Sequence, residues 1–220
     1  MRGGLYAILD PAATRGRDPL EVASAVLEGG CSRLQLRMKS GTDPERLALA
    51  RRLRAACRFH EVPFVLNDRA DLACLVGADA LHLGQDDLPI AEARRIVGAM
   101  EIGRSTHSVA QANEAVAQGA DVVAIGPVFA TNSKADADPV VGLEMLREVS
   151  RLPIPVVAIG GITGDNAAAI REAGATWGAV ISALCADANP KARARALHGV
   201  LSHDARVDAA RAHGVLGGEA

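Results

Sequence analysis

The sequence predicts a single (β/α)8 (TIM) barrel, an α/β fold, and three features of the chain favour it. Short aliphatic runs alternate with alanine-rich amphipathic stretches about eight times in 220 residues, as expected for repeated strand and helix units. Hydrophobic residues make up 49% of the chain but only five are Phe, Tyr or Trp, which suits parallel strands buried on both faces. Several helical stretches also end at glycine. An open doubly wound sheet has the same local pattern, but eight strands in this length favour the closed barrel.

The predicted elements follow one another without a low-complexity linker. Aliphatic or β-branched runs predict strands at 5–9, 33–37, 63–66, 80–83, 101–105, 122–126, 155–160 and 177–182. Amphipathic stretches predict helices at 19–28, 43–60, 69–76, 89–97, 108–118, 142–150, 164–173 and 189–200. Glycines at 29–30, 77, 119 and 174 are interpreted as left-handed caps that stop a helix. We therefore expect one catalytic barrel domain over 1–202 and a flexible polar, Gly-rich tail over 203–220.

Composition and charge exclude several classes of partner. The formal net charge of −2 gives no basic surface for nucleic acid or an anionic membrane. No apolar segment approaches the roughly 20 residues needed to span a bilayer. The cysteines form no CxxC pair and are interpreted as small core hydrophobes: Cys31, Cys57, Cys74 and Cys185. We expect a cytoplasmic protein that acts on small molecules, and a homo-oligomer is compatible with this interpretation.

Polar side chains follow almost every predicted strand, at the end of the barrel where such enzymes carry their chemistry. After the second strand, Gln35, Arg37 and Lys39 alternate and therefore project from one side of an extended segment. Arg37 and Lys39 could instead pair with carboxylates on an exposed loop. His82 and His107 are interpreted as hydrogen-bonded structural residues, because no second histidine lies at metal-ligand spacing.

Two aspartates after neighbouring strands form a candidate metal site. Asp68 follows the third strand and Asp87 the fourth, and Mg²⁺ usually takes only one or two carboxylates from a protein and completes its shell with water and phosphate oxygens. Taken singly, each aspartate is better explained as a helix cap. Gln35, Arg37 and Lys39 are expected at the same rim, and their presence favours the metal site instead.

The loops after the last two strands predict a phosphate site. AIGGIT, with Gly160 and Gly161, and VIS, with Ser182, each precede a helix, as in barrels that bind a phosphate group after strands seven and eight. A tight strand-to-helix turn without a ligand is the alternative. The chain has no Walker A sequence and no GxGxxG after its first strand, so nucleotide-binding folds are not supported.

Seven motifs in order over residues 5–190 resemble the thiamine-phosphate synthase family. They are QLRxK, NDR, HLGQxD, STHS, GPVFxTxSK, AIGGIT and VIS. The resemblance implies a transferase that joins 4-amino-2-methyl-5-hydroxymethylpyrimidine diphosphate to a thiazole phosphate, giving thiamine monophosphate and pyrophosphate. It implies a dissociative reaction assisted by Mg²⁺, in which the pyrimidine carbon ionises before the thiazole nitrogen attacks it.

The family's functional residues can be carried over by motif. The resemblance implies that Asp68 and Asp87 bind the metal. It implies contacts with the diphosphate by Arg37, Lys39, Asn67 and Lys134, with the pyrimidine by Gln35 and Ser105, with the thiazole by Thr131 and Ser133, and with its phosphate by Gly161, Ile181 and Ser182. Among these, Arg37, Ser105 and Lys134 are the expected catalytic residues.

The chain departs from the family pattern at four positions. Met38 and Ser40 stand where acidic residues are common, and we expect Met38 to point away from the site. Ala130 replaces a frequent proline, and Ser133 stands where threonine is common, so the hydroxyl group is kept.

Two other functions remain as alternatives. A related thiazole tautomerase is one alternative, although it has a histidine where this chain has Pro127. A barrel that binds a phosphorylated ligand without catalysis is the other.

Overall fold

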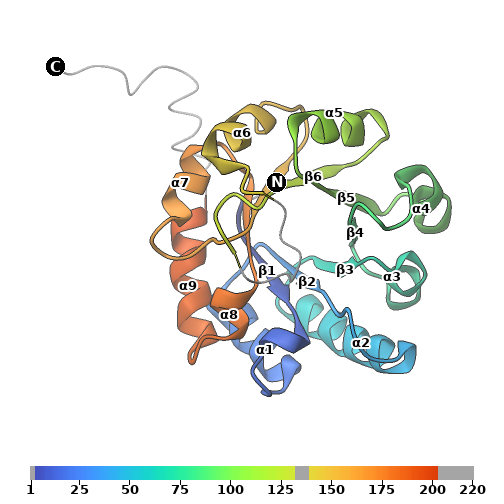
Figure 1. Cartoon of the computed structure of the whole chain (residues 1–220). Helices are drawn as coiled ribbons and strands as arrows, with labels where there is room; N and C mark the ends of the chain where they lie inside the picture. The colour runs from blue at the N-terminus through green and yellow to red at the C-terminus, as the bar shows by residue number, and fades with distance from the viewer. Residues whose placement is uncertain (1–2, 132–138, 203–220) are drawn as a thin grey trace.

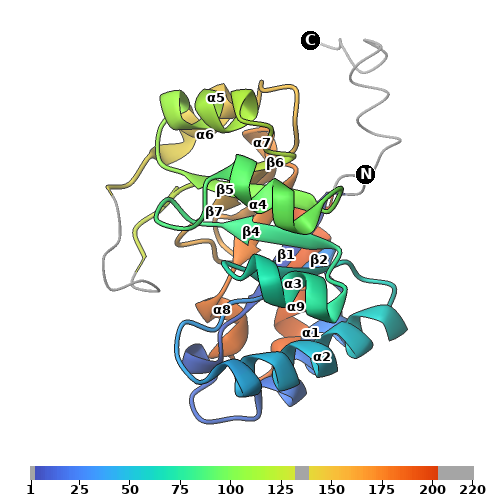
Figure 2. The same ribbon diagram turned by 90° about the vertical axis from the view of Figure 1, so that its right-hand side faces the viewer.

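The computed structural model describes residues 3–131 and 139–202, in which eight parallel strands form a closed barrel. Each strand pairs with the next along the chain, and the last pairs with the first, with Gly4 opposite Trp177. Helices surround this ring of strands (Figures 1 and 2). The strands are β1 (Gly4–Leu9), β2 (Arg33–Leu36), β3 (Phe64–Asn67), β4 (Ala80–Leu83), β5 (Glu101–Thr106), β6 (Val122–Ile125), β7 (Val156–Ile159) and β8 (Trp177–Val180). The predicted fold class is confirmed.

The eight predicted helices are present, and two short ones were not expected. The expected helices are α1 (Pro19–Gly29), α2 (Asp43–Phe59), α3 (Ala70–Val76), α4 (Ile90–Val97), α5 (Val109–Ala117), α6 (Gly142–Val149), α7 (Ala167–Glu172) and α9 (Pro190–Leu201). The additional ones are the 3-10 turn η1 (Pro11–Ala13) and α8 (Ser182–Cys185). Helix α7 starts later than predicted because Asn166 Oδ1 accepts the Thr163 N–H at 2.8 Å and forms a turn there.

Local sequence explains where several helices begin and end. Thr42 and Glu45 form a reciprocal capping box that starts α2. Gly77 ends α3 in the left-handed conformation, with φ +63°, and Gly119 and Gly174 follow α5 and α7 with φ +88° and +92°. The interpretation as left-handed helix caps is confirmed for these three glycines. It was wrong for 29–30, because Gly29 is the last residue of α1 and Gly30 ends that helix with φ +100° and ψ +130°, outside the left-handed helical region.

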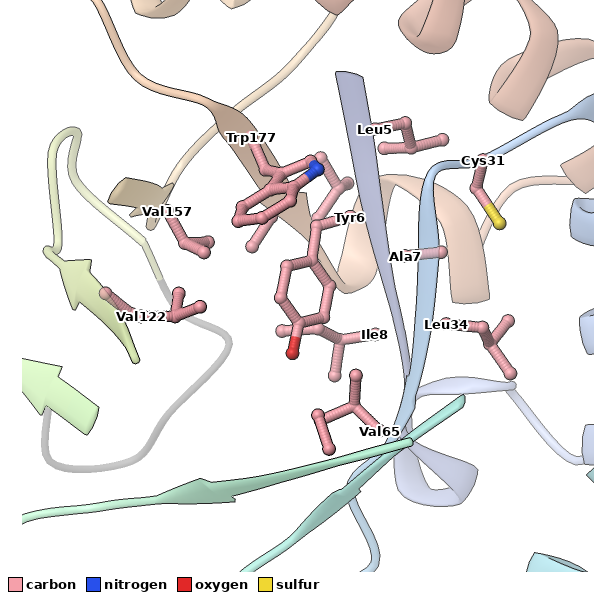
Figure 3. Close-up of a cluster of buried hydrophobic side chains, with 14 of the residues drawn as sticks. Leu5, Tyr6, Ala7, Ile8, Cys31, Leu34, Val65, Val122, Val157 and Trp177 are labelled. Carbon is pink, nitrogen blue, oxygen red and sulfur yellow. The ribbon is translucent and has the colours of Figure 1, made fainter. Parts of the chain in front are cut away.

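Side chains of β1 alternate between the inside of the barrel and the surrounding helices. Figure 3 shows Tyr6 and Ile8 on the same side of β1 as Trp177, with Leu5 and Ala7 on the opposite side. All four β1 side chains are almost fully buried, as expected for a strand covered on both faces. Three of the four cysteines are buried as expected, but Cys74 is exposed on α3, so the prediction was wrong for that residue.

The described parts of the chain contain no helix long and apolar enough to cross a membrane. The predicted tail, 203–220, lies outside the described residues, so the division into domain and tail stays a prediction.

Candidate functional site

Two adjoining cavities lie at the carboxyl ends of the strands, where the sequence predicts the site. The larger, of about 740 Å³, is lined by Arg37, Lys39, Asp68 and Asp87 and is called here the carboxylate cavity. The smaller, of about 660 Å³, is lined by the glycines of the loops after β6 and β7 and is called the glycine cavity. Both share a floor of six residues, namely Ser105, His107, Ala124, Ile159, Ala179 and Ile181. Two ligands bound in these cavities would therefore meet over one floor.

Asp68 and Asp87 come together in the carboxylate cavity, and neither caps a helix. Their side chains are hydrogen-bonded to each other. The cap positions of α3 and α4 are Arg69 and Pro89, and neither helix has a side-chain cap bond. Asp87 Oδ2 instead accepts the Gly84 N–H at 2.6 Å, which closes the loop after β4. The alternative that both aspartates are helix caps is therefore wrong.

The two carboxyl groups are perturbed in opposite directions. Burial raises the pKa of Asp68, and the neighbouring Asp87 raises it further, against the effect of Lys39. Burial also acts to raise the pKa of Asp87, but hydrogen bonds with Asp68 and Gly84 outweigh it, so that pKa is lowered. Two carboxyl groups held this close are a donor set that a divalent cation fits, because its charge offsets the repulsion between two carboxylates.

Lys39 and Asn67 position Asp68. Lys39 Nζ lies 2.6 Å from Asp68 Oδ2, and Asn67 Nδ2 donates to Asp68 Oδ1 at 2.5 Å. Asp68 has φ +66°, a left-handed conformation that is uncommon outside glycine but tolerated by Asp. Within residues 3–131 and 139–202, no group of three or more His, Cys, Asp or Glu side chains could hold a metal ion. Any cation here would complete its shell with other oxygens.

Arg37 pairs with Asp10, a residue that the sequence prediction missed. The Arg37 guanidinium donates to Asp10 Oδ2, and Asp10 Oδ1 accepts the Ala12 N–H at 3.0 Å at the start of η1. Asp10 lines the glycine cavity and Arg37 the carboxylate cavity, so this ion pair connects the two. Asp10 directly follows β1, so it lies at the same rim as the other candidates. That position in the sequence was enough to predict it as a site residue.

The alternation predicted for the segment after β2 is confirmed. Gln35, Arg37 and Lys39 all line the carboxylate cavity. Met38 packs against the hydrophobic core instead, so it points away from the cavity as expected. Arg37 and Lys39 also form ion pairs with carboxylates, so the alternative role proposed for them is present together with their place in the cavity.

Hydrogen bonds fix polar side chains that line the two cavities. Gln35 Nε2 donates to Tyr6 Oη at 2.9 Å in a buried contact. His82 Nε2 lies 2.9 Å from Ser105 Oγ, and His107 Nδ1 lies 2.7 Å from the Gly126 carbonyl oxygen. The prediction that both histidines are hydrogen-bonded is confirmed.

The glycines of the glycine cavity are required by contact between two loops. A Cβ on Gly161 would lie 2.4 Å from the Ala130 carbonyl oxygen, and one on Gly160 would lie 2.5 Å from Pro127 Cβ. Both residues have positive φ, +102° for Gly160 and +65° for Gly161. The loop after β6 also donates from Phe129 N to the Gly160 oxygen at 3.1 Å. Close packing therefore explains these glycines without a ligand, while still leaving their backbone at the cavity wall.

The remaining predicted residues lie partly in the glycine cavity. Thr131, Ile181 and Ser182 line it, and Ser182 is the first residue of α8. Ala130 lines the same cavity. Ser133 and Lys134 lie outside the described residues, so their predicted contacts stay predictions.

Fold and cavities together define a class: a (β/α)8 barrel enzyme with polar loops at the carboxyl ends of its strands. The sequence model described as thiamine monophosphate synthase matches residues 5–184. The chain therefore belongs to the thiamine monophosphate synthase family, and it is a transferase of thiamine biosynthesis.

Similar proteins point to the same family. The thiamine-phosphate synthase of Synechococcus sp. (strain WH7803) is 47% identical to this chain. The matched region covers 90% of this chain and 57% of the length of that protein. That of Anaeromyxobacter dehalogenans (strain 2CP-C) is 47% identical over 87% of this chain and 85% of its own length. Among solved structures, thiamine phosphate pyrophosphorylase from Pyrococcus furiosus has a TM-score of 0.83 and 35% identity, covering 90% of this chain and 94% of that one.

Proposed function

We propose that this protein joins 4-amino-2-methyl-5-hydroxymethylpyrimidine diphosphate to a thiazole phosphate, giving thiamine monophosphate and pyrophosphate. The observation that carries the proposal is the meeting of paired carboxylates and two cationic side chains in one cavity that shares its floor with a second. A diphosphate and its metal suit the first cavity, and a phosphomonoester suits the second. Family membership supports the same assignment.

Mg²⁺ is the cation that we propose for Asp68 and Asp87. The pair supplies two carboxylates, which is the number that Mg²⁺ usually takes from a protein, and diphosphate oxygens and water would supply the rest. When bound, the ion would add positive charge beside the leaving diphosphate. The Gly84 N–H bond would hold Asp87 in place for this role.

The chain's own cations would stabilise the leaving group. As the C–O bond between the pyrimidine methylene and the diphosphate breaks, the electron pair stays with the diphosphate and its negative charge grows. Fixed charges of Arg37 and Lys39 then bind the transition state more strongly than the ground state. Asn67 and Lys134 are the other proposed diphosphate contacts.

The shared floor would align the two substrates. Gln35 and Ser105 would bind the pyrimidine, held by their hydrogen bonds to Tyr6 and His82. The lone pair of the thiazole nitrogen would then form the C–N bond to the ionised methylene carbon. Proposed contacts on the thiazole side are Thr131, Ser133, Gly161, Ile181 and Ser182. Holding both partners in adjoining cavities makes the step effectively unimolecular.

A two-substrate assay tests the proposal. Incubation with both substrates and Mg²⁺ should release pyrophosphate and form thiamine monophosphate in equal amounts, and chelation of the metal should stop both. Absence of product with metal present would show that the assignment is wrong. Isomerisation of a thiazole phosphate without the diphosphate substrate would favour the tautomerase alternative, and ligand binding without turnover the non-catalytic one.

A further inference from the structure

The loop between β1 and α1 forms one wall of the glycine cavity. Its residues Asp10, Ala12, Ala13 and Arg15 line that cavity together with Gly161 and Ser182. The loop is fastened to α8, because Arg17 Nη2 donates to the Cys185 carbonyl oxygen at 2.6 Å.

The same loop is well ordered by its own bonds. Thr14 is only 1% exposed, and its Oγ1 lies 2.9 Å from the carbonyl oxygens of both Pro11 and Arg17. A buried hydroxyl with two such partners fixes the backbone around it. The backbone on either side of Arg15 is therefore held in place next to the cavity.

Arg15 occupies an unfavourable backbone conformation at that place. Its φ is +55°, and the next residue, Gly16, has φ +80°. Glycine adopts this region freely, whereas a residue with a Cβ does so at a cost. An outlier of this kind beside a ligand cavity suggests that its side chain has a function.

The charge balance of the glycine cavity makes Arg15 significant. Among the described residues, Arg15 is the only lysine or arginine that lines this cavity. The carboxylate of Asp10, which also lines it, is paired with Arg37. Most other lining side chains are alanine, valine, isoleucine or glycine. The cavity is therefore biased toward an anionic group.

We propose that Arg15 binds the phosphomonoester of the thiazole substrate, as a binding residue contributed by the β1–α1 loop. This inference rests on the proposed function, because it assigns a contact to that function's second substrate. A guanidinium presents paired N–H donors that match phosphate oxygens, and its charge does not titrate at neutral pH.

Steady-state kinetics of Arg15→Gly, with each substrate varied in turn, test the contact. Glycine removes the guanidinium and suits φ +55°, so the variant should fold at least as well as the parent. We expect KM for the thiazole phosphate to rise about tenfold, with little change in kcat or in KM for the pyrimidine diphosphate. Arg15→Lys should retain part of the affinity. The unphosphorylated thiazole alcohol should react equally well with parent and variant.

Arg51→Ala is the matched control, because Arg51 is exposed on α2 and lines neither cavity. It should leave both KM values unchanged. Unchanged KM for the thiazole phosphate in Arg15→Gly, or a rise for the diphosphate instead, would overturn the proposal. Calorimetric binding of the thiazole phosphate to parent and Arg15→Gly needs no turnover. A lack of turnover in the parent would therefore contradict the proposed function, while equal binding by both proteins would contradict the role of Arg15.

Discussion

At the scale of single residues, Asp87 combines two roles that one substitution can separate. Its Oδ2 closes the loop after β4 by accepting the Gly84 N–H at 2.6 Å, and its charge faces Asp68. Asparagine keeps an oxygen acceptor of the same shape but loses the charge. The substitution Asp87→Asn therefore preserves the loop and tests the carboxylate.

We expect Asp87→Asn to lower kcat by roughly a hundredfold or more and to raise the Mg²⁺ concentration needed for half-maximal rate, since charge stabilisation at the leaving group is lost. Urea unfolding should give a midpoint close to that of the parent. A rate and metal dependence like those of the parent would mean that Asp87 serves the loop alone. The neighbour Asp86→Asn is the control for a charge change that leaves the pair intact.

At the scale of elements, the loops after β6 and β7 support each other through their backbones. A Cβ on Gly126 would lie 2.1 Å from the Ile159 carbonyl oxygen, and one on Gly161 would lie 2.4 Å from that of Ala130. Such distances cannot be relieved by rotating a side chain, because the atom contacted is backbone. These two loops therefore form one wall of the glycine cavity as a unit, and the β1–α1 loop forms another.

Gly161→Ala should separate these loops. We expect a loss of roughly 1–3 kcal/mol in the free energy of unfolding, from the clash and from φ +65°, with a higher KM for the thiazole phosphate. Gly77→Ala is the control: its φ is +63° but its added Cβ would meet nothing within 4 Å. It should lose stability by the conformational cost alone and keep parental KM values. Equal effects of the two variants on KM would contradict the role of loop contact.

At the scale of the whole molecule, a largely buried ion pair joins β2 to β5, three strands away in the barrel, at the end away from the cavities. Arg33 of β2 donates two hydrogen bonds to Glu101 of β5, one of them at 2.9 Å. The guanidinium carbon of Arg33 also lies 4.3 Å from the centroid of the Trp177 ring. The side chain of Arg33 is only 8% exposed and that of Glu101 23%, so water screens the pair little.

Glu101→Gln should destabilise the barrel by about 3 kcal/mol, because it removes the anionic partner of the buried Arg33 guanidinium. Urea unfolding measures the loss, and KM for both substrates should stay near parental values because the pair is remote from the cavities. The double variant Arg33→Met with Glu101→Leu should recover much of the stability, since no unpaired charge remains. A double variant as unstable as Glu101→Gln would show that the pair does more than neutralise charge.

Local patterns in the sequence are sufficient to predict the barrel and the rim that carries its site. Eight strand and helix units follow from local periodicity, and parallel strands bring their carboxyl ends to one rim, so the positions of Gln35, Arg37 and Lys39 could be predicted from alternation. The family followed from motif order. Short helices such as α8 could not be predicted, because four residues carry too little periodic signal.

Which side chains meet becomes visible only in the folded chain. Asp68 contacts Asp87 and Lys39, Arg37 binds Asp10, and Arg17 fastens the β1–α1 loop to α8 across 168 positions of sequence. Strand register and loop packing set these distances, and both depend on interactions between residues far apart in the chain, which no local pattern encodes.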